Sequence, residues 1–345
     1  MVASTSFALF LSSFLPLVHG HVAKKPAPHR NASYGDSLVV SEAPDYVRPY
    51  ILPNLEGKKV QLATDVFRML VTNASSGGAF SLLGTNGVHG LVVPEHYHSE
   101  YYETFFCVKG ALNVWVDDQV RRLTAQDFGA VPAFHNHSYQ LVEPDSQFTG
   151  FISPGGPGIP WPVVRRSGEE VRRQPRPNPS LDADAVNGTN PGGVWHTGSN
   201  PIPTNDSTPY YVANNYGPKH LNLALGQVVA KRATPQSTGG RFSLSTVVMR
   251  KRRANDTIPT YSLPEPYVVQ VLEGQLTVRL AGYEDTLAQG DVAFVPGNTG
   301  FSYWSEVNFV KFYVGASGSE GLDVELTKPG SGAEEWDYAV LPAYA

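Results

Sequence analysis

The chain is built from short apolar runs. Val, Leu, Phe, Tyr and Thr gather in stretches of a few residues, and Gly, Pro, Asn and Asp separate these stretches. Residues 111–118 and 275–282 alternate apolar and polar side chains with a period of two, as strands with one buried face do. Stretches with helical periodicity are scarce. The pattern predicts an all-β protein, a sandwich or a barrel.

The alternating segments belong to an internal repeat. Residues 108–132 align with residues 272–296 without a gap. Identical residues fall at one offset: Gly110 with Gly274, Asp127 with Asp291, and Pro132 with Pro296. Upstream, residues 76–82 match residues 238–244, two residues out of that register. Each half is therefore one copy of a duplicated β unit, about the size of one barrel.

The repeat predicts how the chain divides into domains. We expect a first domain over residues 21–157 and a second over residues 211–345, joined by a long connection over residues 158–210. Pro, Gly, Asn and Asp dominate this connection, as they do in surface loops. We expect Trp161 and Trp195 to pin it to the barrels.

The N-terminus resembles a targeting segment. Residues 6–20 are apolar and end in a small residue, which is typical of a secretory signal peptide. We expect residues 1–20 to be removed and the protein to be secreted and extracellular. Sequons agree with export. We expect glycans at Asn31, Asn73, Asn187, Asn205 and Asn255, and we disfavour the sequon at Asn136, which adjoins a histidine predicted to be buried.

Composition and charge exclude several classes of protein. The 345 residues carry a formal net charge of −5 without a long basic or acidic run, so no nucleic-acid partner is expected. Beyond the N-terminus, no stretch is apolar and long enough to suggest a membrane span. Cys107 is the single cysteine, which rules out an intrachain disulfide, and its apolar neighbours predict a buried thiol.

Candidate chemistry lies in the stretch PEHYHSEYYETFF, residues 94–106. His96 and His98 face the same side of a strand, and Glu103 can return to that side after a short turn. A third imidazole would come from His137 or from His135, which share a face. Glu100 could compete with Glu103. Such a set suits copper, iron, nickel or manganese better than a structural zinc ion, and burying it without a partner would be costly.

The spacing resembles the cupin signature, G-x5-H-x-H-x(3–4)-E-x6-G followed by P-x4-H. Gly90 and Gly110 frame the first part, and the distance from Pro132 selects His137 as the third imidazole. In the second part of the signature, the position two residues after the proline is normally glycine, and here it is Phe134. The duplicated halves make the chain similar to a bicupin, two jelly-roll β-barrel domains. In the second half the ligand positions fall on Thr260, Ser262, Tyr267 and Phe301, so that barrel is expected to be metal-free.

A bicupin with one ligand set, in its first half, resembles the fungal quercetin 2,3-dioxygenases. The segments HYHSEYYETFFCVKG and DFGAVP…HSYQ carry the likeness. The resemblance implies one divalent metal, copper first, and cleavage of a flavonol by O₂ with release of carbon monoxide and a depside. It implies that His96, His98, Glu103 and His137 bind the metal.

In that interpretation Glu103 would also take the 3-hydroxyl proton of the substrate, and burial would raise the pKa of Glu103 for this task. Phe105 and Tyr139 would line the substrate pocket, although plain barrel core is an equal alternative. Two other functions stay open: a bicupin acting as oxygenase, isomerase or cyclase on another secondary metabolite, and a non-catalytic metal-binding protein. A pocket plugged by Phe134 or Tyr139 would favour the latter. A homodimer is an option that the pattern does not decide.

Overall fold

The computed structural model describes most of the chain beyond its N-terminal region. The described residues are 37–62, 64–89, 92–156, 193–196, 198–214 and 216–336, together with the backbone of residues 184–185. The predicted signal peptide, Gly90, Trp161, Asn31 and Asn187 lie outside them. Within this part, strands dominate, and helix is confined to α1 (Asn73–Ser76), α2 (Leu322–Glu325) and a 3-10 turn over Gln236–Thr238. None of the described helices is long and apolar enough to span a membrane.

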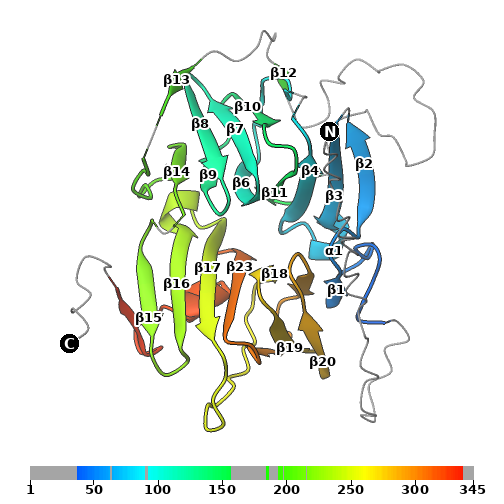
Figure 1. Cartoon of the computed structure of the whole chain (residues 1–345), viewed down its shortest axis with the longest axis vertical. Coiled ribbons are helices and arrows are strands. Elements are labelled where there is room, and N and C mark those ends of the chain that lie inside the picture. Colours follow the sequence, from blue (N-terminus) through cyan, green and yellow to red (C-terminus); the bar gives the residue numbers. More distant parts are fainter. Residues whose placement is uncertain are drawn as a thin grey trace, which may run out of the picture. The chain divides into compact units, whose positions relative to one another are not determined.

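Two sheets form the first half of the fold (Figure 1). The larger has the order β14 (Tyr210–Val212), β9 (Phe128–Val131), β6 (Tyr102–Lys109), β11 (Ser146–Ser153), β4 (Ser81–Gly87), β3 (Asp65–Val71) and β2 (Lys58–Leu62). The smaller has the order β12 (Asp184–Ala185), β5 (His96–Tyr97), β10 (His137–Leu141), β7 (Ala111–Val116), β8 (Gln119–Thr124) and β13 (Val194–Trp195).

The second half repeats this arrangement. Its larger sheet has the order β1 (Tyr50–Leu52), β21 (Val292–Val295), β18 (Tyr267–Glu273), β23 (Phe309–Ser317), β17 (Phe242–Arg250), β16 (Gln227–Ala233), β15 (Lys219–Asn222) and β24 (Ala333–Glu335). Its smaller sheet has the order β20 (Tyr283–Leu287), β19 (Leu276–Leu280) and β22 (Phe301–Trp304). The run β9-β6-β11-β4-β3-β2 thus recurs as β21-β18-β23-β17-β16-β15, and the predicted bicupin fold is confirmed.

The two halves exchange edge strands. β1 precedes the first barrel in sequence but pairs antiparallel with β21 of the second, Ile51 opposite Ala293. β14 follows the connection and pairs with β9 of the first barrel, Tyr211 opposite Gly129. Each exchange covers the edge of a large sheet, which would otherwise present unpaired backbone groups. β1 and β14 therefore cross the predicted domain division, whose boundaries stay a prediction.

The core comprises three clusters of buried side chains. One lies within the first barrel and includes Phe105, Tyr139 and Phe148, while a second lies within the second barrel. The third takes residues from both halves, and its aromatic rings stack, as Tyr50 on Phe294 at 5.3 Å between centroids. Apolar burial of this kind is the main force that holds the barrels together.

The connection between the barrels is held by its backbone. Val194 and Trp195 pair in parallel with Gln119 and Val120 of β8. Trp195 is 57% exposed, so it attaches the connection to the first barrel through its backbone and not through a buried side chain. The hydrogen bonds of β13 to β8 take that role.

Candidate metal centre

The four predicted ligands meet inside the first barrel, three of them from strands of its two sheets. His96 on β5 lies opposite His137 on β10, and β6 supplies Glu103. His98 follows β5 by one residue, so it faces the same side as His96. All four side chains are buried, and one ligand atom from each lies within 4.8 Å of all the others. An ion about 2.0–2.2 Å from each atom would separate opposite ligands by about 4 Å, so the group has the size of a metal site.

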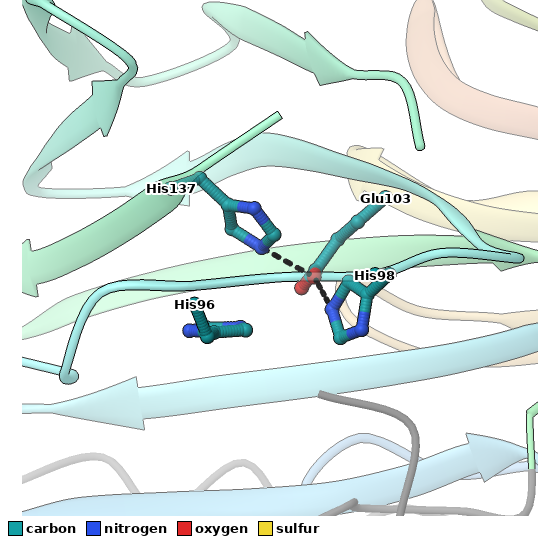
Figure 2. Close-up of side chains that lie close together, drawn as sticks. All are labelled: His96, His98, Glu103 and His137. Atoms are coloured by element: carbon teal, nitrogen blue, oxygen red, sulfur yellow. Dashed lines mark hydrogen bonds and ion pairs between the residues drawn. The ribbon is translucent and has the colours of Figure 1, made fainter. Parts of the chain in front are cut away.

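The hydrogen bonds of the imidazoles favour a cation between them. The Nδ1 atoms of His96 and His137 lie 2.8 and 3.0 Å from the backbone oxygens of Pro94 and His135, so both atoms carry hydrogen. The Nε2 atoms of His98 and His137 lie 2.9 and 3.1 Å from the same Oε2 of Glu103 (Figure 2). A second hydrogen on His137 would make it a buried cation. A shared metal ion removes that requirement, because each Nε2 lone pair then binds the ion.

The electrostatics keep the His96 imidazole neutral. Burial, together with the neighbouring His137 and His98, lowers the pKa of His96 to about 3. Neutral imidazole is the form that binds metal ions. Burial also acts to raise the pKa of Glu103, but hydrogen bonds from His137 and His98 outweigh it and leave that pKa well below its usual range. The expectation of a raised pKa for Glu103 is therefore wrong for this arrangement.

The two competing residues lie away from the group. His135 contacts the Asp117 carboxylate through Nδ1 at 2.7 Å and the Ser207 carbonyl oxygen through Nε2 at 2.9 Å. Glu100 is exposed to solvent. The structure thus brings His137 and not His135 to the centre, and Glu103 and not Glu100.

Aromatic side chains adjoin the centre on its barrel side. Phe105 is fully buried and meets the His137 ring edge-on at 6.1 Å. Tyr139 packs on Phe105 at 5.6 Å and on Phe148 at 4.9 Å. Parity along the strands predicted that Phe105 and Tyr139 face inward, but Phe148 was missed. Its position opposite Cys107 on β6 becomes visible only in the sheet register.

Phe134 occupies a turn position that suits glycine. Its φ is 68°, in the left-handed region where side chains clash with the backbone. Its amide donates to the His98 carbonyl oxygen at 2.7 Å, which ties the turn to the ligand segment. The ring itself is 71% exposed. Phe134 therefore does not plug the centre.

The second barrel has no equivalent centre among its described residues. Tyr261 and Phe301 form the bridge that corresponds to the pairing of His96 with His137. The aligned position is Thr260, so the structural equivalence is shifted by one residue. Tyr267 packs edge-on against Phe301 at 5.7 Å, which fills the space with aromatic rings. An apolar core has replaced the ligands.

The remaining sequence features are compatible with their predicted roles. Asn73, Asn205 and Asn255 are exposed, as glycosylation requires. Cys107 is buried, and burial raises the pKa of its thiol to about 12. Asp65, a fully buried carboxyl at the start of β3, was missed. The period-two pattern of Asp65 with Phe67 and Met69 could have revealed it.

Comparison with known proteins agrees with the fold and the centre. The family model for the cupin domain matches residues 87–146. The chain is 36% identical over 348 residues to quercetin 2,3-dioxygenase of Aspergillus japonicus, covering 89% of this chain and 99% of that one. The chain belongs to the quercetin 2,3-dioxygenase family. The predicted recognition as a cupin dioxygenase, an oxidoreductase that incorporates O₂, is thereby confirmed.

Other relatives are more distant. Quercetin 2,3-dioxygenase of Bacillus subtilis (strain 168) is 32% identical over 130 residues, covering 38% of each chain. Among solved structures, an oxalate decarboxylase formate complex from Lactobacillus farciminis superposes with a TM-score of 0.53 at 13% identity, covering 81% of this chain and 88% of that one. A putative glyoxylate-induced protein from Pseudomonas aeruginosa gives 0.51 at 11% identity, covering 85% and 96%. These two likenesses concern the fold alone.

Proposed function

We propose that the protein is a secreted, copper-dependent dioxygenase that opens the heterocycle of a flavonol such as quercetin with O₂. Membership of the quercetin 2,3-dioxygenase family supports the reaction class. One structural observation carries the proposal: imidazole Nε2 atoms of His98 and His137 converge on the Glu103 carboxylate at 2.9 and 3.1 Å, in a buried setting.

The donor set suits the metal that the proposal names. Three neutral imidazoles and one carboxylate offer nitrogen and oxygen ligands, which copper binds strongly. When bound, the ion would polarise the enol oxygen of the substrate and supply the redox chemistry with O₂. The carbonyls of Pro94 and His135 would orient the rings of His96 and His137 towards it.

Glu103 is the base of the proposed reaction. Its Oε2 would accept the 3-hydroxyl proton of the flavonol, which turns the enol into an electron-rich enolate. With imidazole hydrogens on Oε2, the pKa of Glu103 is too low for this task. Once the Nε2 atoms of His98 and His137 serve as ligands, they carry no hydrogen to donate, so these two hydrogen bonds no longer oppose protonation of Oε2.

Phe105 and Tyr139 position the substrate. Both side chains are buried beside His137, and their flat apolar rings suit the flat rings of a polyphenol. They would also keep water from the enolate. The 71% exposure of Phe134 means that this ring does not block the centre.

The first test joins two measurements on the protein secreted by a eukaryotic host. Elemental analysis gives its metal content, and the visible absorbance of quercetin in air follows cleavage. We expect about one copper ion per chain, from the single four-ligand centre, and rapid loss of the flavonol band. One metal ion per chain with an unchanged band would contradict flavonol cleavage.

The second test isolates the base. Glu103→Gln should lower kcat about 100-fold or more, because the amide cannot accept the proton. The matched control is Glu100→Gln, which alters an exposed carboxylate three residues away and should leave kcat unchanged. Metal content is measured for both variants. A Glu103→Gln variant that keeps its metal and turns over normally would remove the base role.

A further inference from the structure

The first barrel contains a second buried carboxyl, Asp65 at the start of β3. Its side chain is fully buried. Oδ1 accepts a hydrogen bond from the Thr64 hydroxyl at 3.2 Å, whereas Oδ2 has no hydrogen-bond partner among the described residues. Burial raises the pKa of Asp65 to about 6, against the opposing effect of Thr64. Native proteins seldom leave such an atom unpaired, so it calls for an explanation.

Asp65 faces the interior of the barrel. It is two residues from Phe67 and four from Met69, which both belong to the first-barrel core, so all three point to the same face of β3. Its Cα partner on β4 is Gly87, and a Cβ at Gly87 would lie 2.7 Å from Oδ1. The glycine leaves room for the carboxyl.

Other buried polar atoms share this interior. The hydroxyls of Ser81, Thr85 and Tyr139 are buried. That of Ser81, like Oδ2 of Asp65, lacks a hydrogen-bond partner among the described residues, while those of Thr85 and Tyr139 lie close to each other. Thr85 lies opposite Phe67 on one side and opposite Phe148 on the other. Because Tyr139 packs on Phe148 at 4.9 Å, the three hydroxyls line the same interior as the aromatic rings.

Tyr139 links this polar group to the metal centre. Burial raises the pKa of the Tyr139 phenol, and the charges of Asp65 and Glu103 add to this effect, whereas the neighbouring Thr85 hydroxyl opposes it. The phenol is therefore within electrostatic reach of both carboxyls. Ser81 lies nearer the centre, since Ile152 pairs with Ser81 on one side and with Glu103 on the other.

A structural role would look different in this fold. Asp323 of the second barrel is equally buried, but both of its oxygens are paired. The Ser243 hydroxyl donates to Oδ1 at 2.5 Å, and Ser245 and Lys231 donate to Oδ2 at 2.7 and 3.1 Å. The fold can thus satisfy a buried carboxylate completely. At Asp65 it leaves an acceptor open.

We propose that Asp65, Thr85 and Tyr139 form a polar subsite that binds phenolic hydroxyls of the substrate remote from its 3-hydroxyl, with Oδ2 of Asp65 as acceptor. The proposal rests on the proposed function, because the 3-hydroxyl is placed at Glu103. A buried polar group stays unpaired when the ligand lacks the matching hydroxyl, so the site discriminates strongly against such a ligand. The subsite therefore selects polyhydroxylated flavonols over bare ones.

The test measures binding to metal-loaded protein without O₂, so that no turnover occurs. The probes are quercetin, galangin, which lacks the hydroxyls of the single ring, and 3-hydroxyflavone, which lacks those of the fused ring as well. We expect the wild-type Kd to rise about tenfold or more when the hydroxyls that the subsite binds are removed. In Asp65→Leu and Thr85→Val the discrimination should fall towards onefold, while affinity for 3-hydroxyflavone is retained.

Thermal unfolding of the same variants supplies an independent readout. Asp65→Leu should raise Tm, because it removes an unpaired buried group, whereas the control Asp323→Leu should lower Tm. A lowered Tm for Asp65→Leu would mark Asp65 as structural and overturn the proposal. Equal wild-type Kd values for the three flavonols would overturn the subsite alone. A wild type that binds none of them would overturn both the subsite and the proposed function.

Discussion

At the scale of single residues, the centre depends on two backbone carbonyls. The oxygens of Pro94 and His135 each hold the Nδ1 hydrogen of a ligand two residues along the chain. This contact selects the tautomer whose Nε2 lone pair is free to bind a metal ion. Ring orientation is therefore set locally, within the segments that carry the ligands.

Acid should destabilise the metal-free protein through His96. Its folded pKa of about 3 lies below the unfolded value of 6.5, so its contribution to stability is present above pH 6.5 and is lost as pH falls towards 3. Between pH 6.5 and 5 we expect a loss of about 2 kcal/mol in unfolding free energy. Urea denaturation of chelated wild type and His96→Gln measures the difference.

His196→Gln is the control for that series. His196 is exposed, so its removal should leave the pH dependence as in the wild type. A wild type and a His96→Gln variant with parallel stability profiles from pH 7 to pH 5 would show that His96 is not the group responsible.

Phe134→Gly should stabilise the protein. The left-handed backbone of Phe134 costs about 1–3 kcal/mol, and its exposed ring buries little in return. The added glycine loses more conformational entropy on folding, which offsets part of this relief. We therefore expect the unfolding free energy from urea denaturation to rise by about 1 kcal/mol. Asn298, at the equivalent turn of the second half, has a φ of 59°. Asparagine tolerates this region, so Asn298→Gly should change stability less, and an equal gain would count against backbone strain as the cause.

At the scale of elements, the exchanged edge strands couple the halves. β1 holds three residues, yet all are buried, and its middle residue belongs to the second-barrel core. Its neighbours Tyr50 and Leu52 belong to the core that both halves share. A short segment at the start of the first domain thus completes the second.

Truncation of that middle residue tests the coupling. Ile51→Ala should cost about 2–4 kcal/mol of global stability, because it leaves a cavity in the second-barrel core. Hydrogen exchange at the amides of β21 should rise with it. Val39→Ala, an exposed side chain on the neighbouring segment, should cost little. Faster exchange confined to the first barrel would contradict the coupling.

Sequence periodicity predicted the central strands but not these edges. Residues 111–118 alternate clearly, and β7 (Ala111–Val116) lies where that pattern placed a strand. Three residues, as in Tyr50–Leu52, carry no measurable period, and their partner lies in the other half. The sequence did predict that His96, His98, Glu103 and His137 meet. Their spacing along the chain indicates which side of a strand each residue faces, and this needs no knowledge of distant contacts. The low pKa of Glu103 escaped prediction, since it depends on a contact with His137 from a distant strand. Asp65 was overlooked, although its period-two pattern with Phe67 and Met69 is local.

At the scale of the whole molecule, the shared core makes the barrels interdependent. Buried residues of both halves pack in one cluster, and the Thr149 hydroxyl donates to Gln270 across it at 2.9 Å. Neither half has a complete large sheet without a strand from the other. The second barrel therefore supports the first structurally.

Calorimetry should show this interdependence as one transition. We expect a single unfolding peak whose calorimetric and van't Hoff enthalpies agree, because the shared core cannot be lost in one barrel alone. Residues 21–157 expressed alone should lack cooperative unfolding, since they lack β14 and half of the shared core. Two resolved peaks, or a cooperatively folded fragment, would contradict the expectation.

During synthesis, β1 is made long before the strand with which it pairs. Tyr50 leaves the ribosome about 240 residues before its partner Phe294, and at about 5–20 residues per second the interval is about 10–50 s. During that time the three residues of β1, which are buried in the folded protein, have no partner strand. The backbone groups at the edge of β9 likewise stay unpaired until β14 is made. The nascent first barrel lacks its β14 edge until residues 210–212 emerge, whereas β1 waits longer, for the second barrel, and holding chaperones would act in these windows.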